Sequence, residues 1–217
     1  MIFDKLRGAF PFVNEIGTIV HVGAHLGQEV EDYYKLGFRK IVLIEASPDT
    51  YEKLVSRISG FDENIRRSVI HLQCLVSCQD DEFLEFYEFD NEGASSSIYK
   101  STKLKRDVCK VAETGRSFRL KTFRLDTLLA SLGILPNHLS ALVVDVQGAE
   151  FNVLLGCGVY LKYPHFIDIE VSRYEYYDGA PLYNYVEKVL DVNGFKRVTP
   201  IPNHNDCLFV NKRSYLY

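Results

Sequence analysis

The chain has 217 residues, a length that fits one sizeable domain whose core forms without a metal or disulfide staple. Hydrophobic residues make up 47% of it and charged residues 25%, as in ordinary soluble proteins. The formal net charge of −4 argues against a protein that binds nucleic acid by neutralising phosphates.

The cysteines are odd in number and scattered along the chain: Cys74, Cys78, Cys109, Cys157 and Cys207. They form no CxxC pair, which favours reduced thiols and a cytoplasmic location. No apolar run approaches the roughly 20 residues that span a bilayer, and the apolar core of a signal peptide is missing. The amphipathic pattern of residues 1–13 predicts a packed N-terminal helix.

Short β-branched runs alternate with helical periodicities in the first part of the chain, which predicts a β-α-β-α order. The expected strands span residues 18–22, 40–44 and 68–76. A helix follows the first strand and ends near Gly37. Ser47 and Pro48 form a good N-cap and first-turn pair, so a second helix is expected to begin there.

The middle of the chain changes character. Residues 83–89 and 118–124 are typical of extended segments, and a polar stretch, residues 93–97, lies between them. We expect residues 80–125 to form an insertion with a ligand-covering loop, because loops of this length are usually functional or disordered. Basic residues crowd its central part, Lys105 among them, and are expected on a solvated surface.

The β-α order then resumes, with strands expected at 141–146 and 165–171 and helices at 148–155 and around 182–190. Tyr185 of the last helix is expected to pack in the core. Strands 195–199 and 207–210 are joined by a connection that allows only an antiparallel hairpin. The sequence therefore predicts an α/β fold, a single domain over residues 1–217 with one doubly wound, mostly parallel sheet.

A glycine-rich turn separates the first strand from its helix. Its pattern is Gly23-x-x-x-Gly27, not the GxGxxG of dinucleotide binders, and it lets backbone approach a ligand closely. Glu45 closes the second strand, where a carboxylate is placed to accept hydrogen bonds from both hydroxyls of a ribose. The turn and the acid together predict a nucleoside-containing cofactor.

Ligands of doubly wound sheets bind outside the carboxyl ends of the strands, where the strand order reverses. The residues expected at that edge are Gly23, His25, Glu45, Ser77 and Asp145. A sulfonium cofactor suits this edge, because it carries no pyrophosphate and needs no free helix N-terminus to hold one.

Five segments resemble the motifs of FkbM-type methyltransferases, in the family's order. They are residues 19–28 (IVHVGAHLGQ), 44–48 (IEASP), 94–97 (ASSS), 125–128 (LDTL) and 144–150 (VDVQGAE). The resemblance implies a class I, Rossmann-like methyltransferase with S-adenosylmethionine as donor and an oxygen acceptor, often on a sugar or a polyketide-like molecule.

Together with the strand-end argument, the resemblance yields two sets of predicted contacts. Those to the cofactor are assigned to Gly23, Ala24, His25, Gly27, Glu45, Ala46, Ser77, Asp145 and Gln147, and those of the serine-rich loop to the acceptor are assigned to Ser96 and Ser97. The chain departs from the family pattern at three positions. His21 replaces an aspartate, Gln147 a glutamate, and His25 stands where asparagine is commonest. We expect His21 to be a buried, hydrogen-bonded strand residue and the methionine end of the cofactor to be held differently.

Three acids are candidates for the general base that removes the proton of the acceptor. Asp145 is preferred, because the end of a central strand beside the cofactor is where the acceptor arrives; Glu150 and Glu170 follow. These oxygens could also chelate a divalent ion, but no DxD-type cluster supports that reading and no metal is expected. Tyr174 and Tyr176 follow the fifth strand and are predicted to contact the acceptor, because aromatic faces and phenolic hydroxyls suit a sugar.

The sequence thus predicts an O-methyltransferase acting on a sugar or glycan hydroxyl, with no nucleic-acid partner and no stable membrane insertion. One alternative moves the reaction to a non-sugar small molecule. A nicotinamide-dependent oxidoreductase is disfavoured by the GxxxG turn and the final hairpin. The third alternative is a non-catalytic cofactor-binding protein, which the exchanges at His21 and Gln147 motivate.

Overall fold

The computed structural model describes residues 17–215, and the helix expected at residues 1–13 lies outside this range. The helices are α2 (Val30–Lys35), α3 (Pro48–Ser59), α4 (Glu63–Ser68), α5 (Lys103–Cys109), α6 (Leu125–Ser131), α7 (Glu150–Gly156) and α8 (Tyr183–Val192). The strands are β1 (Thr18–Val22), β2 (Lys40–Glu45), β3 (Val69–Gln73), β4 (Leu75–Val76), β5 (Phe83–Phe89), β6 (Glu113–Phe123), β7 (Leu139–Val144), β8 (Phe166–Ser172), β9 (Phe195–Arg197) and β10 (His204–Asn211).

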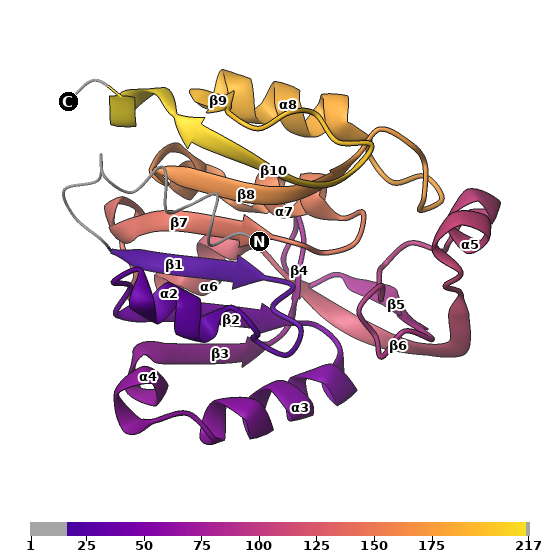
Figure 1. Ribbon diagram of the computed structural model, residues 1–217, viewed down its shortest axis with the longest axis horizontal. Helices are drawn as coiled ribbons and strands as arrows, with labels where there is room; N and C mark the ends of the chain where they lie inside the picture. Colours follow the sequence, from indigo (N-terminus) through magenta and orange to yellow (C-terminus); the bar gives the residue numbers. More distant parts are fainter. Residues whose placement is uncertain (1–16, 216–217) are drawn as a thin grey trace.

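A seven-stranded sheet forms the centre of the molecule, with the strand order β3-β2-β1-β7-β8-β10-β9 (Figure 1). The neighbouring strands β3, β2, β1, β7 and β8 are parallel to one another, whereas β10 runs antiparallel to both β8 and β9. The order reverses between β1 and β7, which places the switch point of the sheet there. The doubly wound, mostly parallel α/β fold with a final hairpin is therefore confirmed.

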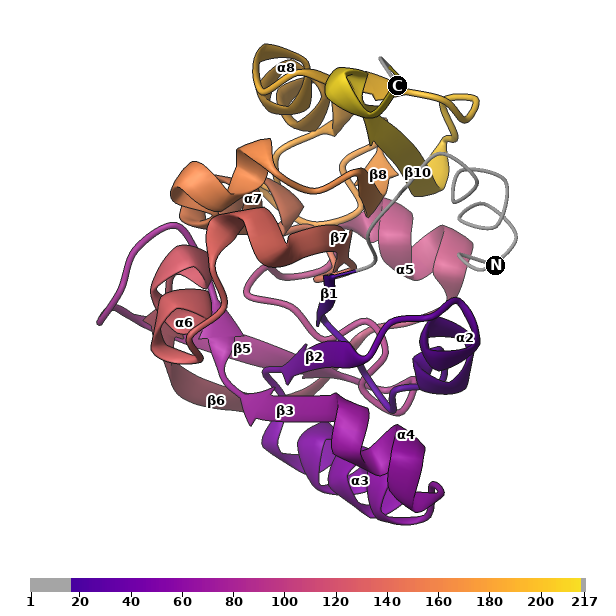
Figure 2. The same ribbon diagram turned by 90° about the vertical axis from the view of Figure 1, so that its left-hand side faces the viewer.

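Alternating side chains of the central strands explain how both faces of the sheet are covered. Ile19 of β1 packs in a core cluster with side chains of α2, α3 and α4, whereas Val20 and Val22 belong to a second cluster with α6, α7 and α8. Figure 2 shows these two groups of helices on opposite sides of the sheet. The continuous apolar runs predicted as strands are thus buried on both faces.

The start of α3 follows the predicted capping chemistry. Ser47 is its N-cap, and the Ser47 hydroxyl accepts a hydrogen bond from the backbone N–H of Thr50 at 3.3 Å. Pro48 occupies the first turn, where its missing N–H leaves no bond unmade. These caps fix where the chain turns away from the end of β2.

The segment expected as one strand over residues 68–76 is divided between two sheets, which corrects that prediction. β3 ends at Gln73 in the large sheet, and the backbone N–H of Cys74 then donates to the carbonyl of Glu45 at 3.1 Å. Leu75 and Val76 form β4, which pairs in parallel with the end of β6. The change of partner directs the chain into the insertion.

The insertion is a small sheet, β4-β6-β5, together with α5, and it projects from the end of the molecule at which β1, β2 and β3 terminate (Figure 1). It is held to the loop after β8 by backbone hydrogen bonds, from Thr102 to the Tyr176 carbonyl at 2.9 Å and from Asp178 to the Lys100 carbonyl at 2.8 Å. The insertion therefore lies at the carboxyl edge of the sheet.

Two further side chains lie elsewhere than the sequence predicted. Lys105, expected on a solvated surface, is only 1% exposed, because α5 packs its ammonium 4.0 Å from the ring centroid of Tyr177. Tyr185, expected in the core, is 53% exposed on α8 and meets only the edge of Phe151 among the described aromatic rings. Within residues 17–215, no helix has the length and apolar character that crossing a bilayer requires.

Candidate functional site

The glycine turn brings three strand ends into contact. Gly23 has a φ of +83°, and a Cβ at this position would lie 1.7 Å from the carbonyl oxygen of Asp145. The backbone N–H groups of Gly23 and Ala24 donate to the carbonyl of Ile44 at 2.9 and 3.0 Å. Only glycine fits a left-handed conformation against a neighbouring backbone, so Gly23 fixes the spacing of β1, β2 and β7 at the switch point.

Glu45 stands at the end of β2, and both of its carboxylate oxygens accept backbone hydrogen bonds. Its Oε2 accepts from the backbone N–H of His25 at 2.9 Å and its Oε1 from that of Ser47 at 2.8 Å. Burial raises the pKa of Glu45 to about 7, against the lowering effect of these hydrogen bonds. A carboxylate has about four lone-pair sites, so the ionised group keeps acceptor capacity for a ligand.

A hydrogen-bonded network follows the end of β7. The amide nitrogen of Gln147 donates to Asp145 Oδ1 at 2.6 Å and to Glu170 Oε2 at 2.8 Å. The Gln147 amide oxygen lies 2.6 Å from the hydroxyl of Tyr177, which acts as the donor. Gln147 itself has a φ of +56°, a left-handed conformation uncommon for a residue with a side chain. Its amide thereby joins β7, β8 and the loop after β8.

Burial raises the pKa values of the two acids in this network, Asp145 and Glu170. It raises the pKa of Asp145 to about 6, partly offset by the hydrogen bond from Gln147. Burial and the neighbouring charge of Asp145 hold the pKa of Glu170 well above its usual range. At neutral pH the Asp145 carboxylate is therefore ionised, whereas burial and the charge of Asp145 favour the neutral form of Glu170.

Glu150 is bound to the backbone of the turn that precedes it. Its carboxylate accepts hydrogen bonds from the N–H groups of Val146 at 3.1 Å and Gly148 at 3.0 Å, and burial raises its pKa to about 7. These bonds hold the turn formed by residues 145–150, which gives Glu150 a positioning role in the resting structure.

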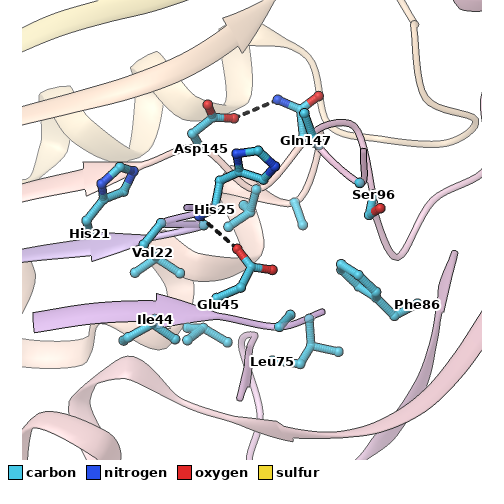
Figure 3. A pocket seen from close by; sticks show the side chains of 18 of the residues that line it. His21, Val22, His25, Ile44, Glu45, Leu75, Phe86, Ser96, Asp145 and Gln147 are labelled. Carbon is cyan, nitrogen blue, oxygen red and sulfur yellow. Dashed lines mark hydrogen bonds between the residues drawn. The ribbon is translucent and has the colours of Figure 1, made fainter. Parts of the chain in front are cut away.

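The strand ends and the insertion enclose a cavity of about 170 Å³ (Figure 3). The strand ends and their loops contribute His21, Gly23, Ala24, His25, Glu29, Glu45, Ala46, Asp145 and Gln147, and the segment between β3 and β4 together with the insertion contributes Cys74, Leu75, Val76, Phe86, Gly93, Ala94, Ser96 and Ile98. One end of the cavity is thus polar and acidic, and the other is apolar.

This cavity, the larger of two described here, has no lysine or arginine in its walls among the described residues. Its walls carry the three carboxylates of Glu29, Glu45 and Asp145. Burial lowers the pKa of His21 to about 4, so this histidine is neutral at physiological pH. A site with this charge distribution attracts a cation and repels an anion.

A second, smaller cavity of about 20 Å³ is lined in part by Gly148 and Glu150 of the turn at residues 145–150. Glu150, Glu170, Tyr174, Tyr176 and His204 are among its lining residues. The ring of His204 lies 4.6 Å from that of Tyr176, and its Nε2 is 3.6 Å from Glu170 Oε1. The turn at residues 145–150 therefore contributes to both cavities.

The structure divides the predicted site residues between several places. Most predicted cofactor contacts line the larger cavity, and Ser96 joins them from the insertion. Tyr174 and Tyr176 line the smaller cavity together with Glu150 and Glu170.

Three predicted residues line neither cavity. Gly27 faces the helix α3, where a Cβ would meet Leu54. Ser77 is buried beside Gly156. The Ser97 hydroxyl donates to the carbonyl of Gln147 at 2.6 Å, so Ser97 holds the insertion against the turn at residues 145–150.

Sequence reasoning did not find Glu29, Phe86 or His204. Glu29 lies two residues after Gly27 of the glycine turn, and Phe86 is a buried residue of β5, so both had a local signal. His204 had none, because it reaches Glu170 only through the antiparallel pairing of β10 with β8. His21 is buried and accepts or donates a hydrogen bond at 3.1 Å with the hydroxyl of Tyr33, as expected.

Three acidic side chains approach one another closely enough to suggest a metal site. Ligand oxygens of Asp145, Glu150 and Glu170 lie within 4.8 Å of one another, a spacing that a hard cation accepts. However, Gln147 donates to two of the acids and backbone N–H groups donate to the third. Each carboxylate has about four lone-pair sites, so these hydrogen bonds leave acceptor capacity, and the expectation that no metal binds stays a prediction.

Comparisons with known proteins agree with this fold. The model of the methyltransferase FkbM domain matches residues 21–197. No curated protein sequence matches the chain. The FkbM methyltransferase of Methylobacillus flagellatus KT has a similar structure, with a TM-score of 0.54 and 14% identity over 89% of this chain. This chain covers only 43% of the length of that protein.

Two other solved structures share the fold at low identity. The methyltransferase domain of bacterial CtHen1-CN has a TM-score of 0.50 and 13% identity, covering 96% of this chain and 97% of its own. A protein of the NADB-Rossmann superfamily from Streptococcus agalactiae has a TM-score of 0.51 and 9% identity, covering 95% and 67%. Structural similarity at such low identity indicates the fold, whereas the function has to be argued from the residues of the site.

Proposed function

Because the chain belongs to the FkbM methyltransferase family, we propose that it transfers a methyl group from S-adenosylmethionine to a hydroxyl of a sugar or glycan. The family match covers the glycine turn, Glu45 and the turn at residues 145–150. It therefore includes every element that forms the larger cavity.

The main support for the proposal is the charge of the side chains that line the larger cavity. Its walls hold three carboxylates and no lysine or arginine within residues 17–215. S-adenosylmethionine bears a sulfonium and an ammonium group and no phosphate, whereas a nicotinamide dinucleotide would bring a pyrophosphate into the same acidic space. Like charges at close range are strongly disfavoured, so this cavity favours the sulfonium cofactor over the dinucleotide.

The remaining walls fit the other parts of the cofactor. The two oxygens of Glu45 suit the paired hydroxyls of a ribose. Leu75, Val76 and Phe86 offer an apolar surface on which a purine ring can pack. Gly23 and Ala24 bring backbone close to the ligand without an intervening bulky side chain.

When bound, the cofactor supplies an activated methyl group, and the protein then has to orient the acceptor and remove its proton. Asp145 is the proposed base, because it alone among the three candidate acids lines the larger cavity. Its raised pKa of about 6 leaves it ionised at neutral pH and still basic enough to take a proton. Gln147 orients this carboxylate through the bond at 2.6 Å.

A carbohydrate acceptor is proposed from the side chains around the turn. Ser96 approaches the larger cavity from the insertion, while Tyr174 and Tyr176 surround the neighbouring smaller one. Aromatic faces stack on the apolar face of a sugar ring, and hydroxyl groups bond to its edges.

We propose that the protein has no nucleic-acid partner. The five cysteines are free thiols, which supports a reducing, cytoplasmic setting for the reaction.

Two experiments test the proposal. In calorimetric titrations, S-adenosylhomocysteine and S-adenosylmethionine should bind and NAD should not; binding of NAD alone would favour an oxidoreductase. Incubation with 13C-methyl-labelled cofactor and a panel of glycans and phenolic small molecules, followed by mass spectrometry and NMR of the labelled carbon, identifies the acceptor. A methyl carbon attached to nitrogen or carbon would contradict O-methylation. Binding without transfer to any acceptor would favour the non-catalytic alternative.

A further inference from the structure

Glu29 is a carboxylate that faces the larger cavity without a side-chain partner. It immediately precedes α2, is partly buried and lines the cavity. Within residues 17–215, no hydrogen bond to another residue and no ion pair engages its carboxylate. Burial raises the pKa of Glu29, and the charge of Asp145 raises it further. A cationic ligand beside this carboxylate would favour its ionised form.

The charge of Arg57 lowers the pKa of Glu29, but Arg57 does not line the cavity, and no lysine or arginine among the described residues does. His21, at the same end of the cavity, is buried with a pKa of about 4 and is therefore neutral. Its Nδ1 is 3.1 Å from the hydroxyl of Tyr33, which is also uncharged. The end of the cavity beside β1 thus contains the acids Glu29 and Asp145, and the strand β1 itself contributes no acid there.

We propose that Glu29 binds the α-ammonium group of S-adenosylmethionine. This inference rests on the proposed function, because it concerns the methionine end of the same cofactor. The ammonium carries three donors, and a charge-assisted hydrogen bond in a partly desolvated site is stronger than one between neutral groups. The carboxylate that this ligand needs is therefore supplied by the residue before α2, while position 21 is occupied by neutral histidine.

A purely local role for Glu29 predicts a different result. Acids near the start of a helix are stabilised by its free N–H groups, and Glu31, in the first turn of α2, shares that benefit. Glu31, however, is exposed and does not line the cavity. Glu31→Gln is therefore a matched control, which removes the same charge from the same helix outside the site.

The experiment compares two ligands on three proteins by calorimetric titration. S-adenosylhomocysteine carries the α-ammonium group, whereas 5′-methylthioadenosine shares the nucleoside but lacks the amino-acid end. We expect Glu29→Gln to weaken S-adenosylhomocysteine binding by roughly 10- to 100-fold, as loss of a charge-assisted hydrogen bond does. Binding of 5′-methylthioadenosine should stay within about threefold of the wild type, and Glu31→Gln should leave both ligands unaffected.

The outcomes separate the inference from the proposed function. An unchanged affinity of Glu29→Gln for S-adenosylhomocysteine overturns the inference and leaves the methyltransferase proposal standing. Equal losses for both ligands also overturn it, because Glu29 would then shape the cavity without contacting the ammonium. A wild-type protein that binds neither ligand overturns both proposals. Should Glu29→Gln fail to fold, Glu29→Asp, which keeps the charge on a shorter stem, should lose affinity only for S-adenosylhomocysteine.

Discussion

The amide nitrogen of Gln147 donates to Glu170 Oε2 at 2.8 Å and so links the turn after β7 to the end of β8. The same nitrogen is 2.6 Å from Asp145 Oδ1. A neutral donor between two buried acids lets them lie close together without a metal or a bound cation between them. The exchange of glutamate for glutamine relative to the family motif therefore suits the acids that surround it.

Gln147→Glu should destabilise the protein in a pH-dependent way. The new carboxyl would lie beside Asp145 and Glu170, so its folded-state pKa would be raised. A group with a raised folded pKa stabilises below its unfolded pKa, and that contribution is lost as pH rises through the folded value. Urea denaturation should show a deficit in the free energy of unfolding that is small at pH 5 and larger at pH 8. The exposed Gln73→Glu should show no such pH-dependent deficit.

Glu45→Gln should reduce affinity for S-adenosylhomocysteine by roughly 10- to 100-fold, because an amide cannot accept from both ribose hydroxyls. In the wild type, the affinity should increase with pH up to about 7 and then level off, since the ionised carboxylate is the better acceptor and burial raises the pKa of Glu45 to about 7. Titrations between pH 5.5 and 8.5 test both points. A slope of the same size in the variant would assign the titration to another group.

Asp145→Asn should lower turnover by roughly 10²- to 10⁴-fold, the usual contribution of a general base. The asparagine oxygen can still accept from Gln147, so cofactor affinity should stay within a few-fold. Single-turnover rates and calorimetry measure the two quantities separately. Full activity of the variant would remove Asp145 as the base and direct attention to Glu170.

Gly23→Ala should abolish cofactor binding or folding, because its Cβ would fall 1.7 Å from the carbonyl oxygen of Asp145. Gly115 offers a matched control. It has a similar φ of +89°, but no atom lies within 4 Å of a Cβ built there. Gly115→Ala should therefore lower the free energy of unfolding only by the left-handed backbone penalty, about 1–2 kcal/mol. Equal effects in thermal and urea unfolding would show that the close approach at Gly23 is unimportant.

Lys105→Met should shift the acid limb of the pH–rate profile to higher pH. The ammonium of Lys105 lowers the pKa of Asp145, although burial has the larger, opposite effect. Without this cation the base would ionise at a higher pH. Lys103 lies on the same helix but is exposed, and Lys103→Met should leave the profile unchanged. A profile that does not move in Lys105→Met would place the ammonium outside the electrostatic field of the site.

The central sheet could be predicted from the sequence because its strands are local apolar runs with clear boundaries. Gly23, Glu45 and Asp145 could be predicted to lie close together, because the ends of the predicted strands share one edge of the sheet at its switch point. The division at Cys74 could not be predicted, because β4 exists only through its pairing with a segment more than 40 residues later. Lys105 was placed on the surface for a similar reason, as its partner Tyr177 comes from the loop after β8.

The parallel pairing of β4 with the end of β6 brings the entry and exit of the insertion side by side. A segment whose ends are already held together can be exchanged for one of another length at a small cost in closure entropy. Such an exchange would leave the residues of the large sheet in place and would replace Phe86 and Ser96. It would also have to keep a donor to the Gln147 carbonyl in place of Ser97. We therefore expect grafts between β4 and β6 to change which acceptor is used, if the proposed methyl transfer holds.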